Sequence, residues 1–286
     1  MPSLIDIRRR IRSVKNTQQI TKAMKMVSAA KLRRAQDRTI ASRPYGSLLR
    51  QVLSNVAAAA AGSEEAAANP LLARREENRI LLVLISGDKG LAGAFNTNLN
   101  KAAMRFAAER PNAQISYLLI GRKGRDFFRK RGVNVFGEHI NLAAKVRFSD
   151  TAAIAQQAME KFKAEEIDAV YLLYNEFKSV VSQKLTLNRV LPVEVPTETT
   201  PTDYIYEEPP AEMLADLLPK YVEMEFFRAL LESSAAEHAA RMTAMDAATS
   251  NAADMIDKLT LFMNRVRQAS ITKEIIEVVS GAAAAE

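Results

Sequence analysis

The stretch Lys220–Ser280 (KYVEMEFFRALLESSAAEHAARMTAMDAATSNAADMIDKLTLFMNRVRQASITKEIIEVVS) decides the fold of this chain. It runs for 61 residues without Gly or Pro, and a sequence that long without a backbone breaker is one long helix or is disordered. Disorder fits badly, because mostly apolar residues recur at alternating steps of four and three: Leu231, Ala235, His238, Met242, Met245, Thr249, Ala252, Ile256, Leu259, Met263 and Val266. This spacing is typical of a left-handed coiled coil. Such a helix extends roughly 90 Å and therefore needs partners along its length.

A second run without Gly or Pro, Ser3–Arg43, predicts the partner helix. Its seam begins at Leu4, Ile7, Ile11 and Val14. We expect the seam to slip through the polar residues 17–19 and to resume in another register at Ile20, Met24 and Val27. Pro44–Gly46 should kink or interrupt the helix, and helical spacing then continues to Ala61. Pro219 should likewise bend the last helix or start it anew.

Charge is distributed unevenly between these two helices. Residues 1–43 contain 12 Lys or Arg and 2 Asp or Glu, which gives this segment a net charge of +10. The whole chain has a net charge of +7, so the remaining residues carry −3. Residues 220–286 contain 7 basic and 10 acidic side chains, also −3. A basic and an acidic helix in one chain can attract each other, which favours their pairing.

The middle of the chain alternates between strand and helix patterns. Apolar, strand-like runs occur at Arg79–Ser86, Gln114–Ile120, Val133–Phe136 and Asp168–Tyr174, with helical patterns at Asn96–Glu109, Arg122–Lys130 and Ser149–Ala164 between them. Val180–Leu191 partly alternates and is interpreted as an antiparallel edge strand. The alternation predicts a Rossmann-like α/β layer domain inserted between the paired helices. The expected segments are a helix at 1–61, a linker at 62–77, the α/β domain at 78–192, an irregular foot loop at 193–210, and a helix with an overhanging tip at 211–286.

The last helix is expected to overhang its partner. From the inserted domain outward, the first helix covers about 58 residues and the last about 75, which leaves roughly 17 residues, or about 25 Å, without an internal partner. The apolar residues of that tip are Ile271, Ile275, Ile276, Val278 and Val279. An apolar helix end with no internal partner needs a surrounding partner.

Composition narrows the possible chemistry. The chain has no Cys and only two His, which excludes disulfides and thiolate metal sites and argues against a histidine metal cluster. No apolar run is long enough to span a membrane, and no secretory signal is evident, so a soluble, intracellular protein is expected. No catalytic constellation can be assembled, and no cofactor is expected.

Two other functions remain open at this point. The turn Ser86–Gly93 (SGDKGLAG) follows a strand and precedes a helix, where a phosphate could bind, which would suit a nucleotide-dependent enzyme. Its glycine spacing matches neither the dinucleotide fingerprint nor the P-loop, which favours a plain tight turn. Basic residues near the N-terminus could bind nucleic acid, but no aromatic residue precedes Tyr45, which favours a solvated face or one that meets acidic protein.

Two segments carry a family resemblance. Ile11–Ala35 (IRSVKNTQQITKAMKMVSAAKLRRA) and Ala239–Ala285 resemble the two ends of the F-type ATP synthase gamma subunits, and the likeness extends over nearly the whole chain. The resemblance implies a non-catalytic central rotor shaft inside a ring of three alpha and three beta subunits. Its foot would contact the epsilon subunit and the membrane c-ring. It also implies a role in ATP synthesis and proton transport at the cytoplasmic face of a bacterial inner membrane, as a peripheral protein.

The resemblance also assigns residues. It implies beta-subunit contacts for Met24, Lys25, Arg267, Gln268 and Thr272, and an apolar bearing for the tip residues Ile271, Ile275, Ile276 and Val279. A foot that faces the c-ring and epsilon is implied for Tyr204, Tyr206 and Glu207. The turn departs from the family pattern at Gly87–Gly90 (GDKG), which weakens any role of Lys89. The cysteine-bearing regulatory insert of chloroplast members is absent.

Overall fold

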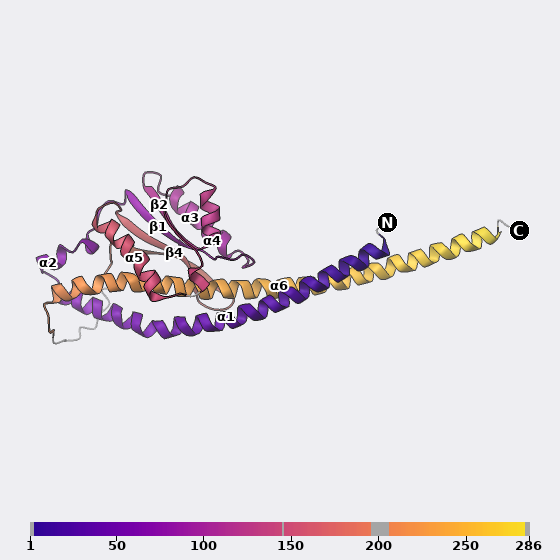
Figure 1. The fold of residues 1–286 in the computed structure, drawn as a ribbon, viewed down its shortest axis with the longest axis horizontal. Helices are drawn as coiled ribbons and strands as arrows, with labels where there is room; N and C mark the ends of the chain where they lie inside the picture. Colours follow the sequence, from indigo (N-terminus) through magenta and orange to yellow (C-terminus); the bar gives the residue numbers. More distant parts are fainter. Residues whose placement is uncertain (1–2, 145, 196–205, 284–286) are drawn as a thin grey trace. The chain divides into compact units, whose positions relative to one another are not determined.

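The structure is a computed structural model that describes residues 3–144, 146–195 and 206–283. It divides into two compact units, which are treated separately below. The coiled-coil unit comprises residues 1–28 and 242–286, and the α/β unit comprises residues 29–241. Two long helices contribute to both units: α1 (Leu4–Ala59) and α6 (Pro210–Ala283) (Figure 1).

A five-stranded sheet forms the centre of the α/β unit. Its strands are β1 (Arg79–Ile85), β2 (Gln114–Ile120), β3 (Val135–His139), β4 (Ala169–Phe177) and β5 (Gln183–Leu191), in the spatial order β3-β2-β1-β4-β5. The first four are parallel, and β5 pairs antiparallel with β4 at the edge. The predicted α/β layer and its antiparallel edge strand are therefore confirmed.

Helices cover both faces of this sheet (Figure 1). On one face, α3 (Phe95–Ala108) and α4 (Arg122–Arg129) pack through Leu99, Phe106 and Phe128. On the other, α5 (Phe148–Lys163) shares a larger core with α1 and α6, in which Leu53 and Phe226 are fully buried. Both faces are covered because a parallel sheet buries each of its sides. The remaining elements are short: α2 (Glu64–Ala67) and the 3-10 turns Pro70–Leu72 and Leu142–Ala144.

Neither helical proline interrupts its helix. Both α1 and α6 continue through Pro44 and Pro219. A helical proline deprives the carbonyl four residues earlier of its donor. Here those carbonyls belong to Ile40 and Ala215, which are exposed, so water can replace the missing donor. The helices are therefore not interrupted at either proline, whereas the alternative expectations, a kink at Pro44 and a bend at Pro219, stay predictions.

Within the α/β unit, α1 and α6 pack as antiparallel neighbours. Their contact includes two ion pairs with buried glutamates: Arg43 Nη2 lies 3.5 Å from Glu232 Oε1, and Arg50 Nη2 lies 3.3 Å from Glu225 Oε1. The two glutamates are seven residues apart on α6 and their arginines are seven apart on α1. This heptad match fixes the register of the pair.

In the coiled-coil unit, the seam of α1 does not slip. Its inward positions continue at steps of three and four through Ile11, Val14, Gln18, Thr21, Lys25 and Ser28, all buried or half-buried. Ile20 and Val27, which we expected on the seam, are 60 % and 57 % exposed. The register is kept because α6 supplies polar partners: Thr249 Oγ1 donates to Thr21 Oγ1 at 2.8 Å, and Lys25 Nζ donates to Asp246 Oδ1 at 2.6 Å.

Candidate functional site

The end of α6 carries a group of uncovered apolar residues in the coiled-coil unit. Each residue from 271 to 280 is exposed, and Figure 1 shows α6 continuing beyond the first residues of α1. The apolar side chains there are 49 % to 72 % exposed: Ile271, Ile275, Ile276, Val278 and Val279. The predicted apolar tip therefore exists and has no cover within the described chain.

These apolar side chains share one side of the helix. At 3.6 residues per turn they span an arc of roughly 160°. The opposite side is polar, and Lys273 Nζ lies 3.4 Å from Glu277 Oε1 there. The tip is thus amphipathic, so one direction around the helix axis presents apolar surface and the other presents charge. Such a helix makes different contacts with partners placed around it.

Polar residues precede and interrupt this apolar surface. Arg267, Gln268 and Thr272 are exposed, and their side chains make no hydrogen bond or ion pair with other described residues. All three are therefore available to a partner. Their contact with a beta subunit stays a prediction.

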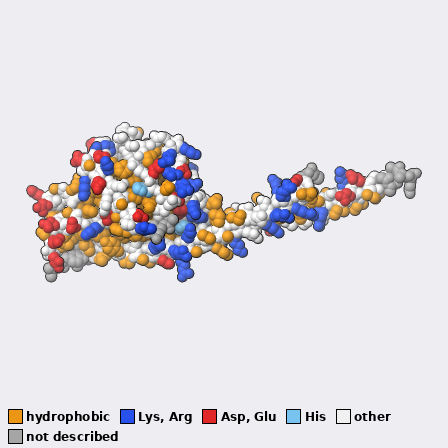
Figure 2. Space-filling model, viewed as in Figure 1, with side chains coloured by type: hydrophobic (Ala, Val, Ile, Leu, Met, Phe, Trp, Pro, Cys, Tyr) orange, Lys and Arg blue, Asp and Glu red, His pale blue; other side chains and the backbone are white. Residues whose placement is uncertain are grey.

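The other two residues assigned to beta-subunit contact lie on α1 of the same unit. Met24 is half-buried, and Lys25 pairs with Asp246 while their side chains remain 40 % and 60 % exposed. An ion pair this exposed contributes about 1 kcal/mol at most, so a competing carboxylate could capture Lys25 at little cost. Figure 2 shows further Lys and Arg side chains gathered on this unit, where Arg8, Arg9 and Arg10 are exposed.

The predicted foot is only partly described. Tyr204 lies outside the described residues. Tyr206 is half-buried and packs against the larger core of the α/β unit, while Glu207 is exposed. Tyr206 therefore has a structural role in this chain, and only Glu207 of the described pair is fully available to a partner.

The turn after β1 is held together by protein groups. Gly87 N donates to Asn96 Oδ1 at 2.9 Å, and Asp88 Oδ1 accepts from the backbone N–H groups of Arg122 and Asn141. A Cβ at Gly87 would lie 2.8 Å from Glu237 Cδ, so a larger residue there would force the Glu237 carboxylate to shift. Gly121 is required opposite it, since its φ is +94° and a Cβ would lie 2.1 Å from the Ser86 carbonyl oxygen. This geometry explains the glycines as packing requirements of a tight turn.

A buried ion pair on α6 secures the same turn, and the sequence analysis missed it. Arg241 Nη2 lies 2.5 Å from Glu237 Oε1, with side chains 8 % and 7 % exposed. The guanidinium also donates to the carbonyls of Gly90 and Lys89. Burial raises the pKa of Glu237, and Arg241 opposes that rise. The i,i+4 spacing of Glu and Arg was a visible signal, but the sequence did not show that the pair is buried.

His238, a predicted seam residue, lies beside this pair. Burial lowers its pKa to about 4, with the positive charges of Arg241, Lys31 and Lys89 acting in the same direction. Its Nδ1 lies 3.4 Å from Arg241 Nη1. The imidazole is therefore neutral near pH 7. No group of His, Asp and Glu that could hold a metal ion occurs among the described residues.

No described helix is long and apolar enough to cross a membrane. A family model described as ATP synthase matches residues 3–285 of the chain. The ATP synthase gamma chain of Solibacter usitatus is 80 % identical over 286 residues, which is the full length of both chains. The chain belongs to the ATP synthase gamma chain family.

Other members of this family and solved structures agree. The gamma chain of Pelotomaculum thermopropionicum is 49 % identical over the full length of both chains. A central stalk and c-ring structure of the Tetrahymena thermophila mitochondrial ATP synthase matches with 29 % identity and a TM-score of 0.63, covering 80 % of this chain and 99 % of that one. A Euglena gracilis mitochondrial ATP synthase chain shows the same fold at 20 % identity, with a TM-score of 0.68 and coverage of 98 % and 94 %.

Proposed function

We propose that this chain is the rotor, or central stalk, subunit of a proton-translocating ATP synthase. It couples rotation of the membrane c-ring to conformational cycling of the catalytic beta subunits, regulates their ATPase activity, and is not itself catalytic. The observation that carries the proposal is the uncovered, one-sided apolar tip of α6, in a chain that belongs to the gamma chain family. Similarity to the central stalk and c-ring structure of the Tetrahymena thermophila mitochondrial ATP synthase supports the same placement.

The asymmetry of the tip supports a mechanical role. In a ring of three alpha and three beta subunits, a one-sided apolar helix contacts each beta subunit differently at any moment. A ligand or partner shifts a conformational equilibrium only through such a difference in contact energy. Rotation moves the apolar side from one subunit to the next, and each catalytic site is biased in turn toward a different state.

Specific polar contacts complete this proposal. Arg267, Gln268 and Thr272, which have no partner within the described chain, would bind a beta-subunit loop. Met24 and Lys25 would meet an acidic beta loop that competes with Asp246. The foot, with Tyr204, Tyr206 and Glu207, would face the c-ring and epsilon. The chain would then work as a peripheral protein at the cytoplasmic face of a bacterial inner membrane.

Truncation of the tip tests the proposal. The full-length chain and a chain ending at Ser270 are each co-expressed with their alpha and beta subunits, and assembly, ATPase activity and torque on a surface-bound complex are measured. Because residues 271–280 are all exposed in the structure, the truncated protein should fold normally but deliver less torque and coupled synthesis. A matched full-length variant, Lys273→Gln, changes the polar side alone and should stay close to the parent protein.

Two results would contradict the rotor function. One is appreciable ATPase activity of the purified full-length chain, which would make it an enzyme in its own right. The other is failure of the full-length chain to co-purify with alpha and beta. Unchanged torque and synthesis after truncation would remove the tip from that function. The urea midpoint of each variant, measured on the free chain, separates loss of function from loss of folding.

A further inference from the structure

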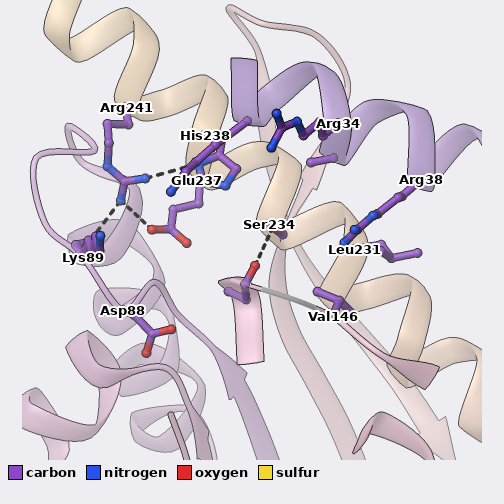
Figure 3. Close-up of a pocket in the computed structure, with 13 residues that line it drawn as sticks. Arg34, Arg38, Asp88, Lys89, Val146, Leu231, Ser234, Glu237, His238 and Arg241 are labelled. Atoms are coloured by element: carbon purple, nitrogen blue, oxygen red, sulfur yellow. Dashed lines mark hydrogen bonds and ion pairs between the residues drawn. The ribbon is translucent and has the colours of Figure 1, made fainter. Parts of the chain in front are cut away.

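A cavity of about 230 Å³ lies within the α/β unit, between the turn after β1, α1 and α6. Five basic side chains line it: Arg241 of α6, which is paired with Glu237, and four others, which are Lys31, Arg34 and Arg38 from α1 and Lys89 from the turn. Figure 3 shows Arg34 and Arg38 on the opposite side of this space from Lys89, with His238 between them. We call it the basic cavity.

The four cations have no partner in the part of the chain that the structure describes. Their side chains make no ion pair or hydrogen bond there, in contrast to Arg43 and Arg50 further along α1, each of which meets a buried glutamate of α6. The next heptad position after Glu225 and Glu232 on α6 is Ala239. Along the α1–α6 contact, α6 thus supplies a glutamate at two successive heptad positions and an alanine at the third.

The two carboxylates that line the basic cavity are already engaged. Asp88 Oδ1 accepts two backbone N–H groups, at 3.1 Å from Arg122 N and 3.0 Å from Asn141 N. Glu237 is buried and paired with Arg241. With these two pairings in place, the four basic side chains remain a surplus of positive charge around one hollow that is open to solvent.

His238 adds a neutral donor. Because a guanidinium can only donate, the Nδ1 of His238 that faces Arg241 accepts, and its proton lies on Nε2. Burial keeps this imidazole uncharged near pH 7. The lining therefore combines four cations with an N–H donor, which is the set of groups that binds a tetrahedral oxyanion.

We propose that the basic cavity binds a phosphate-type oxyanion, either inorganic phosphate or the phosphate group of a nucleotide. The proposal rests on the convergence of Lys31, Arg34, Arg38 and Lys89 on one hollow with no free carboxylate. The small size of the hollow favours an oxyanion over an extended acidic peptide, which would need a groove. This site is separate from the tip and independent of the rotor function.

Histidine-selective NMR of the full-length chain tests this site directly. The chain contains only His139 and His238, so two imidazole signals are expected, and a His238→Gln variant assigns them. Sodium phosphate, pyrophosphate and magnesium-free ATP are titrated against sodium chloride at equal ionic strength. The His238 signal should shift and saturate with a dissociation constant of about 1 mM or below, while that of His139, which does not line the cavity, serves as reference.

Matched variants separate a site from general charge attraction. Arg38→Gln and Lys89→Gln should each weaken binding by about tenfold, because each removes one charged donor. Arg33→Gln removes an equal charge from a neighbouring residue of α1 that does not line the cavity, and should leave the affinity unchanged. All three residues are exposed, and circular dichroism verifies that each variant is folded.

The relative affinities identify the source of the oxyanion. Tighter binding of inorganic phosphate or of ATP would assign the site to that ligand, and either result supports the proposal. Shifts that follow ionic strength alone would overturn it, as would an equal loss of affinity in Arg33→Gln. Shifts caused only by a poly-glutamate peptide would also overturn it and would assign the cavity to acidic protein.

Discussion

Replacing Arg241 by Met should strongly destabilise the α/β unit. The substitution keeps much of the apolar volume of the side chain but removes the only ion-pair partner that Glu237 has among the described residues. The side chain of Glu237 is 7 % exposed. Leaving one member of a buried pair without its partner costs about 3–5 kcal/mol. The carbonyls of Lys89 and Gly90 also lose a donor, but these residues are exposed or half-exposed, so water can replace it.

A double substitution isolates the buried charge. Glu237→Gln combined with Arg241→Met removes the unpaired carboxylate, so it should recover most of the free energy of unfolding lost in Arg241→Met. The single variant should also lose less stability at pH 5 than at pH 8. Burial already raises the pKa of Glu237, and without Arg241 that pKa rises further. A carboxyl with a raised folded pKa binds more protons in the folded state, so its unfavourable contribution appears as pH rises through that pKa.

Urea denaturation of the full-length chain, followed by circular dichroism at pH 5 and pH 8, measures these free energies. The reasoning would be refuted by an Arg241→Met loss below about 1 kcal/mol, the range of an exposed pair. It would also be refuted if the double variant were no more stable than the single variant. Either result would mean that Glu237 reaches solvent or another cation when Arg241 is removed.

Three further variants give distinct expectations. Gly87→Ala should cost about 1–3 kcal/mol in urea denaturation, because the new methyl group meets Glu237 at 2.8 Å, whereas Gly137→Ala, with no atom within 4 Å of the added Cβ, should be nearly neutral. Lys25→Gln should change the free energy of unfolding by about 1 kcal/mol at most, so a large loss of coupled ATP synthesis in the assembled complex would report a partner contact, and no loss would remove Lys25 from that role. The lowered pKa of His238 should make the chain lose stability as pH falls from 6.5 toward about 4, because the unfolded state binds the proton more readily. His238→Gln should flatten that part of the dependence of unfolding free energy on pH. An unchanged dependence would contradict the lowered pKa of His238.

The register of the N-terminal helix shows a limit of predicting coiled-coil packing from the apolar pattern of one helix. Apolar residues at Ile20 and Val27 suggested a slipped seam, yet the structure keeps one register and places these residues outside. A slip of the seam would require the supercoil to unwind or overwind locally. Pairing Thr21 with Thr249 and Lys25 with Asp246 avoids that distortion. The apolar pattern of one helix could not reveal this, because the deciding groups are polar and lie on the other helix, more than 200 residues away.

The sequence by itself determined the local structure of this chain and its family. Two breaker-free runs with coiled-coil spacing predict two long helices, and alternating strand and helix patterns predict the α/β layer, because helix and strand periods are properties of neighbouring residues. The overhang of α6 followed from helix lengths alone. Only the tertiary structure decided which polar groups are buried. Glu237 and Arg241 look like ordinary charged residues of an exposed helix face until the turn after β1 packs against α6, because burial of a charge depends on what distant segments bring to it.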